Sequence, residues 1–216
     1  MIDNYDKLPI GKYQEIREVL KDDSLDELQV QSSIISILTD KTVEDVLNMP
    51  LPEYSECVRK TAFLMTTPKF KAECPKTINL NGIKYNVVRN IDKLTAAQYI
   101  DYQTYMKAKD PDDKLAEILS LFIIPEGKTY NDGYDIGEVA KAISDFLPIS
   151  VGTGICFFFR KKQIESLNYT LTYLGLMMKI WKRKVVTEEQ KRLITEAEQM
   201  MKKLKDLPIG GDGFTM

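Results

Sequence analysis

The chain has 216 residues, 44% of them hydrophobic, which suits one soluble globular domain, with or without a helical appendage, and excludes a disordered or fibrous chain. It contains no histidine, so histidine-based acid–base catalysis, Ser-His-Asp and Cys-His nucleophilic sites and histidine metal ligands are excluded. The net charge of −2 is unevenly spread, because residues 150–209 hold twelve Lys and Arg against six Asp and Glu, which favours head-to-tail association or an acidic partner.

Short helices are predicted for the first third of the chain. Apolar residues at helical spacing indicate a helix near residues 13–20. The run "SLDE" has the pattern of a capping box, in which Ser24 accepts from the backbone N–H of Glu27, and predicts a second helix from there. Another helical piece begins at Thr42, and Pro52 stands in the first turn of a fourth helix.

A β-hairpin is predicted at about residues 77–89. Apolar and polar residues alternate on both sides of Asn81 and Gly82, and this dipeptide supplies the positive φ angles of a tight turn. The run "TAAQ" that begins at Thr95 then caps a helix with three tyrosines, Tyr99, Tyr102 and Tyr105. We expect this helix to pack on the hairpin, since a lone hairpin is marginal in water.

Two further helices are expected before residue 148. Asp110 and Pro111 form an N-cap with a proline in the first turn, and apolar residues follow on one face. A turn-rich connection then leads to a helix that starts near Asp135 and stops at Pro148. Its predicted inward residues are Ile136, Val139, Ala140, Ile143 and Phe146.

The C-terminal part shows long helical periodicity. Its most apolar tract, residues 149–159, has about half of the roughly 20 residues of a membrane span and is interpreted as a buried core segment, so no membrane contact is expected. One apolar series then includes Ile164, Leu167, Leu171, Leu174, Met178 and Trp181, and a second includes Tyr169, Tyr173, Leu176 and Ile180. Two such faces predict burial on two sides. The last helix has a series of its own, formed by Leu193, Ala197, Met200 and Leu204.

These elements predict a mainly α protein of the α+β class, with one β-hairpin and long C-terminal helices. The sign of the charge and the length of the helices both change near Pro148. The predicted organisation is therefore a helical domain with the hairpin at 1–148, a long basic helical hairpin at 149–207 and a glycine-rich tail at 208–216.

No pattern of catalytic, cofactor-binding or metal-ligating residues emerges, so no enzyme activity, cofactor or metal is expected. Gly152 and Gly154 lack the third glycine and the βαβ context of a dinucleotide fingerprint, and a hinge or a close helix contact is the preferred interpretation. Acidic residues around Gly133 do not fit a calcium loop. Cys57 and Cys156 are interpreted as core residues, and Cys74 as the one surface thiol.

Two candidate binding surfaces follow from the pattern. The interface hypothesis uses tyrosines and aliphatic residues on helix faces, because tyrosine combines contact area with a polar tip. Its members are Tyr99, Tyr102, Tyr105, Tyr169, Tyr173, Leu176 and Ile180. The alternative hypothesis is nucleic-acid binding by the basic cluster around Trp181, formed by Lys179, Lys182, Arg183 and Lys184.

Three segments resemble small virion-assembly proteins of tailed bacteriophages, the group similar to tail-assembly chaperones. They are "IGKYQEI", then "ILTDKTVEDVLNMPLPEY", then "INLNGIKYNVVRNIDKLTAAQYIDYQTYMK". The resemblance covers residues 9–124. In that group a K-[YF]-Q helix and a leucine-proline segment precede an "NG" hairpin and "LTxxQ(Y/F)ID". The chain departs from the usual short chaperone by its basic C-terminal helices.

The resemblance implies a non-enzymatic structural or assembly protein that acts through protein–protein contacts, as a tail-assembly chaperone or a component of the head–tail connector or ring. It implies phage structural proteins as partners and the host cytoplasm, or the virion, as the location. A homo-oligomer is compatible with this expectation. The alternative is a nucleic-acid-binding accessory protein that uses the basic C-terminal helices.

Overall fold

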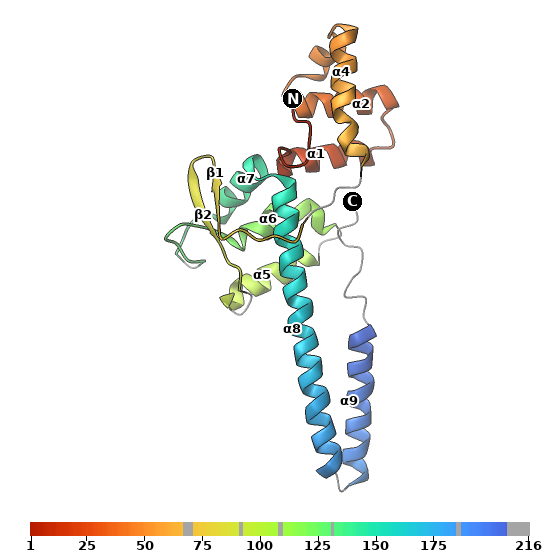
Figure 1. Ribbon diagram of the computed structural model, residues 1–216, viewed down its shortest axis with the longest axis vertical. Coiled ribbons are helices and arrows are strands. Elements are labelled where there is room, and N and C mark those ends of the chain that lie inside the picture. Colours follow the sequence, from red (N-terminus) through yellow and green to blue (C-terminus); the bar gives the residue numbers. More distant parts are fainter. Residues whose placement is uncertain (67–70, 91–92, 108–109, 131, 185–186, 207–216) are drawn as a thin grey trace. The chain divides into compact units, whose positions relative to one another are not determined.

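The computed structural model describes residues 1–66, 71–90, 93–107, 110–130, 132–184 and 187–206 (Figure 1). Helices dominate, and one small antiparallel sheet accompanies them, so the predicted mainly α class is confirmed. The chain divides into two compact units, of which the first ends at Phe158 and the second begins at Phe159. Among the described residues, each helix is too short or too polar to span a lipid bilayer.

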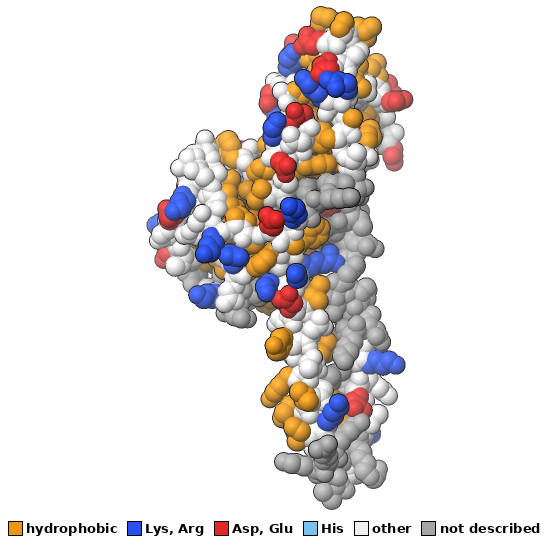
Figure 2. All heavy atoms as spheres, viewed as in Figure 1, with side chains coloured by type: hydrophobic (Ala, Val, Ile, Leu, Met, Phe, Trp, Pro, Cys, Tyr) orange, Lys and Arg blue, Asp and Glu red, His pale blue; other side chains and the backbone are white. Residues whose placement is uncertain are grey.

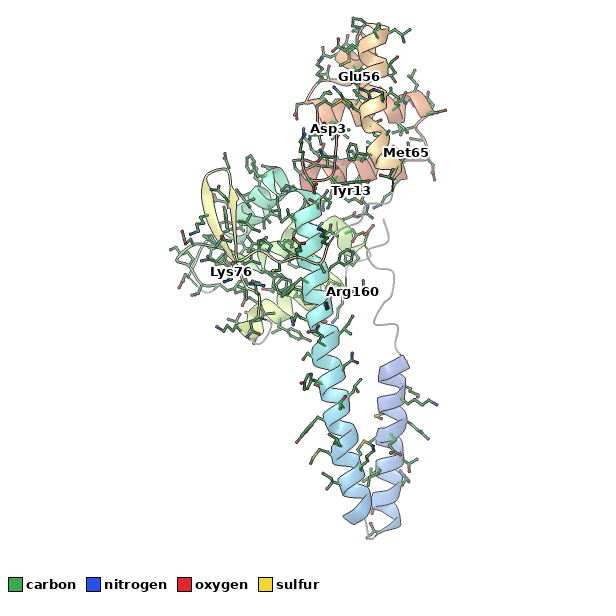
Figure 3. The ribbon with its side chains drawn as sticks, viewed as in Figure 1. Asp3, Tyr13, Glu56, Met65, Lys76 and Arg160 are labelled. Carbon is green, nitrogen blue, oxygen red and sulfur yellow. The ribbon has the colours of Figure 1, made fainter. Side chains whose placement is uncertain are left out.

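The first unit opens with four helices. They are α1 (Ile10–Lys21), α2 (Glu27–Thr39), α3 (Val43–Leu47) and α4 (Leu51–Thr61), and a 3₁₀ turn, η1 (Ala62–Met65), follows. Helix α2 contacts α1, α3 and α4. Ile35, Val46 and Cys57 form a buried cluster between these helices. Met65, at the end of η1, has a side chain that points into solvent (Figure 3).

The start of α2 differs from the prediction. The N-cap is Asp26, whose carboxylate accepts from the backbone N–H of Gln29, while the Gln29 side chain accepts from the Asp26 N–H. Ser24 instead donates to Asp22. The capping box predicted at Ser24 was therefore wrong, because the Asp–Gln pair two residues later satisfies the free backbone donors. The capping residues predicted at Thr42 and Thr95 are both confirmed.

The sheet has three antiparallel strands in the order β1-β2-β3. They are β1 (Thr77–Leu80), β2 (Ile83–Val87) and β3 (Ile123–Pro125). The predicted hairpin is confirmed, and Asn81 and Gly82 have φ angles of 49° and 82° in its turn. Strand β3 was not predicted, because three residues are too few to show an alternating pattern.

Three more helices, α5 (Ala96–Met106), α6 (Leu115–Ser120) and α7 (Ile136–Phe146), complete the first unit before α8, with a 3₁₀ turn, η3 (Pro111–Lys114), before α6. Helix α5 contacts α6 and η3, so the predicted packing of this helix on the hairpin is not among the principal contacts. Helix α7 contacts α1, α6, β1 and β3. Gln98 of α5 is buried and donates to the carbonyl of Leu121 at 2.8 Å. Phe146 was predicted to point inward but is 47% exposed, and Leu147, the next residue, is buried instead.

A short backbone bridge joins the start of the first unit to its end. The N–H of Ile10 donates to the carbonyl of Leu147 at 3.0 Å, and the N–H of Ile149 donates to the carbonyl of Leu8 at 2.8 Å. All four side chains are fully buried. The bridge therefore fixes the first turn of the next helix, α8, in the core of the first unit.

Helix α8 (Ile149–Lys184) begins in the first unit and continues into the second, where α9 (Glu188–Asp206) follows after a short connection. A domain boundary was predicted near Pro148 from the sequence, whereas the two compact units divide after Phe158. The apolar tract at the start of α8 supplies buried side chains, Ile149, Ile155 and Phe159, as the sequence predicted. After Phe159, the buried large side chains among the described residues of α8 and α9 are Leu171, Met178 and Ile194.

An ion-pair network links α1 to η3. Arg17 contacts Asp110 at 3.1 Å and Asp112 at 3.4 Å, and Lys21 contacts Asp110 at 3.0 Å. Asp113 adds a third carboxylate. The Oδ1 atom of Asp112 is buried and has no hydrogen-bond partner among the described residues. Burial raises the pKa of Asp112 to about 6, with further raising by the two neighbouring carboxylates and a partial offset by Arg17.

We expect the substitution Asp112→Asn to stabilise the protein at pH 7 by about 1–3 kcal/mol. A carboxyl group whose pKa is raised on folding binds more protons in the folded than in the unfolded state. Ionisation of Asp112 therefore lowers the free energy of unfolding as the pH rises from about 4 to about 6. Urea unfolding of both proteins between pH 4 and pH 7 measures the difference, which should vanish at the acidic end.

Asp110→Asn is the matched control with the opposite sign. Burial alone would raise the pKa of Asp110, but the hydrogen bond from Lys21 and the charge of Arg17 lower it overall. This carboxylate therefore adds stability above the unfolded pKa, and its loss should destabilise the protein at pH 7. An Asp112→Asn protein that is less stable than the parent at pH 7 would contradict the assignment.

Candidate functional site

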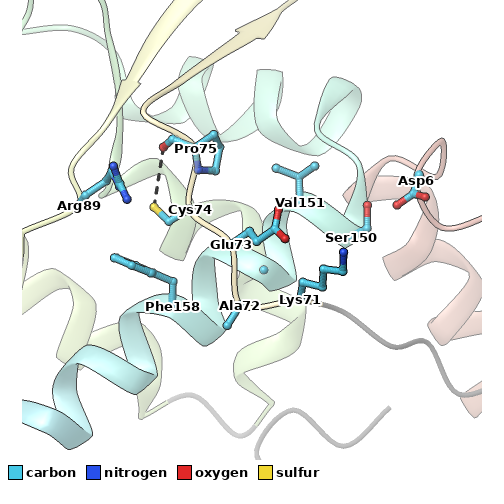
Figure 4. Close-up of a pocket in the computed structure, with 11 residues that line it drawn as sticks. Asp6, Lys71, Ala72, Glu73, Cys74, Pro75, Arg89, Ser150, Val151 and Phe158 are labelled. Carbon is cyan, nitrogen blue, oxygen red and sulfur yellow. Dashed lines mark hydrogen bonds between the residues drawn. The ribbon is translucent and has the colours of Figure 1, made fainter.

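A cleft of the first unit lies between the segment 71–75 and the first turns of α8 (Figure 4). Its volume is about 830 Å³. The lining residues are Asp6, Lys71, Ala72, Glu73, Cys74, Pro75, Arg89, Ser150, Val151, Gly154 and Phe158. They come from four separate parts of the chain, so only the folded first unit assembles the cleft.

Gly154 allows the wall of the cleft to lie against α8. A Cβ atom at this position would stand 2.7 Å from the carbonyl oxygen of Lys71 and 3.2 Å from that of Glu73. A Cβ atom at Gly152 would stand 2.7 Å from Cδ1 of Ile10. The close contact that the sequence favoured for these two glycines is therefore confirmed, since each makes room for a neighbouring segment.

Cys74 is buried, and its prediction as a surface thiol was wrong. The segment that carries it lies against α8, so its Sγ atom is enclosed and 3.8 Å from the carbonyl oxygen of Pro75. The guanidinium of Arg89 lies 5.8 Å from the ring centre of Phe158. Burial raises the pKa of the Cys74 thiol, although the charge of Arg89 acts in the opposite direction.

The chemistry of the cleft does not select a ligand. Lys71 and Arg89 are basic, Asp6 and Glu73 are acidic, and the other lining groups are apolar or weakly polar. A thiol with a raised pKa is a poor nucleophile at neutral pH, because the thiolate is the reactive form. Neither a catalytic group nor a preference for one ligand charge follows from this arrangement.

Gly154→Ala should open the wall of the cleft. The new methyl group would meet backbone atoms of the segment 71–73, which must move, and we expect a loss of about 1–3 kcal/mol in the free energy of unfolding. Cys74 should then react faster with a thiol reagent. Peptide mapping by mass spectrometry after timed labelling measures this rate separately from those of Cys57 and Cys156.

Gly152→Ala provides the control for that experiment. Its methyl group would meet the side-chain end of Ile10 rather than the cleft wall, so stability should fall without faster labelling of Cys74. Equal labelling of Cys74 in the parent and in the Gly154→Ala protein would show that Gly154 does not hold this wall in place.

The glycine-rich and acidic motifs of residues 127–138 form turns and a helix start. Gly127 and Gly133 have positive φ angles. Asp132 accepts from the backbone N–H of Thr129, and Asp135 caps α7 by accepting from the N–H of Gly137 at 2.7 Å. The described residues contain no cluster of three or more side chains that could hold a metal ion.

The second unit has an exposed apolar stripe on α8. We call it the α8 stripe and define it by Tyr169, Tyr173, Leu176 and Ile180, which the sequence placed on one face. All four are exposed, from 46% for Ile180 to 83% for Tyr169. Burial on two sides is therefore not observed within this chain. Figure 2 shows hydrophobic side chains at the surface of this part of α8.

The register of α8 separates this stripe from its buried side. At about 100° per residue, Leu171 and Met178 lie roughly opposite the α8 stripe. These two side chains are buried, whereas Leu174, beside them, is 40% exposed. The side chains of Leu167 and Trp181, from the same predicted series, lie outside the described residues. One apolar face of α8 is thus covered and the other is open.

The three tyrosines of α5 do not form one exposed set. Tyr99 is exposed, whereas Tyr102 and Tyr105 are half-buried. The ring of Tyr102 packs edge-on against Phe122, with 5.7 Å between the ring centres. Among these residues, Tyr99 is therefore the one whose side chain is most accessible to a partner.

The basic cluster of the nucleic-acid hypothesis is described only in part. Lys179 is exposed on α8. The backbone of Lys182, Arg183 and Lys184 continues the helix, but their side chains lie outside the described residues. Their arrangement around a ligand stays a sequence-based hypothesis.

Comparison with protein-family models, with curated proteins and with solved structures found no match to this chain.

Proposed function

We propose that this chain is a non-enzymatic structural or assembly protein that acts through protein–protein contacts. The observation that carries the proposal is the α8 stripe, because large apolar patches on a soluble protein usually mark an interaction surface. Two tyrosines stand beside two aliphatic residues in it. This mixture is typical of protein interfaces, where tyrosine contributes contact area at low entropic cost.

The area of the stripe supports a contact of moderate size. With about 200 Å² for each large side chain, the four residues leave roughly 500 Å² accessible. A standard interface buries about 800 Å² on each partner. The stripe can therefore form the apolar centre of such an interface, with the surrounding polar residues of α8 as its rim.

The proposed setting is the assembly of a tailed bacteriophage. It rests on the resemblance of residues 9–124 to virion-assembly proteins, since the α8 stripe itself does not identify a partner. In this setting the chain is a tail-assembly chaperone or a component of the head–tail connector, and its partners are phage structural proteins.

Leu176→Asp with Ile180→Asp tests the proposal. Both side chains are exposed, so the variant should remain folded, as judged by circular dichroism. It should lose only its binding to the partner protein. We expect the parent chain to form a stoichiometric complex with a structural protein encoded beside its gene on co-expression. Native mass spectrometry of the purified complex measures its composition for the parent and the variant.

Leu51→Asp is the matched control, since Leu51 is 75% exposed in the first turn of α4 in the first unit. The control should retain the complex. A complex that survives the α8 substitutions, or the lack of any complex, would contradict the proposal. Tight binding of duplex DNA or RNA at low salt, with a steep loss as salt rises, would instead support the nucleic-acid alternative.

A further inference from the structure

A second apolar stripe lies open on α9. It consists of Leu193, Ala197 and Met200, which are spaced by four and three residues and therefore share one face of the helix. The side chain of Leu204, the fourth member of the predicted series, lies outside the described residues. Leu193 is 57% exposed and Met200 is 65% exposed, and Ala197 is exposed between them. Ile194, about 100° around the helix from Leu193, is the buried residue of this helix among those described.

We propose that α9 pairs antiparallel with α9 of a second copy of this chain. A twofold axis near Ala197 would place Leu193 of one copy against Met200 of the other, and the same contact would occur twice. Ala197 would face its counterpart at the centre, where its small side chain lets two helices approach closely. The spacing of this stripe is that of an antiparallel helix pair, in which apolar residues repeat every three and four positions.

Charged residues beside the stripe favour this partner and this direction. Glu189 and Lys203 are about four turns apart, so they flank the same side of the stripe. Neither has an ion-pair partner within the described part of its own chain. In the antiparallel pair, Glu189 of each copy lies beside Lys203 of the other. In a parallel pair, the same flank of the two helices would lie on opposite sides of the contact, so Glu189 of one copy would not reach Lys203 of the other.

Arg192 and Glu196 lie between these two charges on the same flank. They already pair with each other along the helix at 3.0 Å, with the Arg192 Nε atom donating to Glu196. The central charges are thus balanced within each copy. The outer charges, Glu189 and Lys203, are then the ones that form ion pairs with a second copy. The polar residues beside the stripe are therefore self-complementary.

The size of the contact sets its strength. Helix α9 has 19 residues and a length of about 28 Å. One helix pair of this length buries less than the roughly 800 Å² per partner of a standard stable interface. The dimer should therefore form reversibly and depend on protein concentration. This inference goes beyond the proposed function, because the α8 stripe and the α9 stripe are on different helices and can fail separately.

The charge arrangement allows a test by reciprocal substitution in the full-length chain. Glu189→Lys and Lys203→Glu should each weaken the dimer by roughly tenfold in its dissociation constant, because each places like charges together at two symmetric points. The double variant should restore parental affinity. Sedimentation equilibrium from low micromolar to millimolar concentration, at low salt, measures all four proteins.

A parent chain that stays monomeric over this range, or a double variant no tighter than the single ones, would overturn the antiparallel pairing. A dimer that is lost in Leu176→Asp with Ile180→Asp, but not in Leu193→Asp with Met200→Asp, would also overturn it. That result would assign self-association to the α8 stripe.

Ala197→Cys provides an independent geometric measurement. Mild oxidation should link two copies rapidly, since this position lies at the proposed axis. Lys202→Cys is the control, because Lys202 is exposed on the other side of α9, about 140° from Ala197. The parent chain, with its three native cysteines, gives the background. Equal linking at both positions would contradict the proposed face.

Discussion

The bridge between residues 8–10 and residues 147–149 is the constraint on which the first unit depends. Two backbone hydrogen bonds, of 3.0 and 2.8 Å, join segments that are far apart in the sequence. The side chains of Leu8, Ile10, Leu147 and Ile149 are fully buried around them. Burial of four such side chains contributes on the order of 6–12 kcal/mol before entropic costs. The bridge closes the first unit and holds the first turn of α8, which lines one side of the cleft.

The two units differ in how many of their apolar side chains are buried. In the first unit, α1, α6, α7 and the sheet contact one another around buried apolar side chains, and the buried amide of Gln98 donates to the carbonyl of Leu121. In the second unit, the described buried side chains are few, and both helices have apolar stripes open to solvent. Two helices can cover one face of each other only, and the remaining faces need a partner to be covered. Large hydrophobic side chains such as Leu51 and Met65 are also exposed in the first unit, so the reason for locating the binding surfaces in the second unit is the regular helical spacing of its exposed apolar residues.

Local patterns in the sequence predicted most elements in which a side chain acts on its own backbone neighbours, with the capping box at Ser24 as an exception. Thr42, Thr95 and Asp135 cap helices where the sequence placed them, and the Asn81-Gly82 turn forms the predicted hairpin. Features that depend on contacts between distant segments were missed. Strand β3 exists because β2 pairs with it, and Cys74 is buried because the segment 71–75 lies on α8 at Gly154.

The candidate surfaces were predictable only as patterns. Helical spacing predicts that four residues of α8 share one face, namely Tyr169, Tyr173, Leu176 and Ile180. The spacing does not predict whether that face is buried or exposed. The same holds for the stripe on α9, whose residues the sequence identified without its exposure. No pattern in the sequence predicted that Arg89 lines a cleft, since its neighbours in the cleft come from distant parts of the chain.

Hydrogen–deuterium exchange at several protein concentrations tests the central claim that the first unit is complete by itself and the second is completed by contacts. Amides of α1, α6 and α7 should show protection that does not change with concentration. Amides of α9, and of α8 beyond Phe158, should become more protected as the concentration rises or as a partner is added. Protection in the second unit that equals that of the first and stays constant at every concentration would contradict the account.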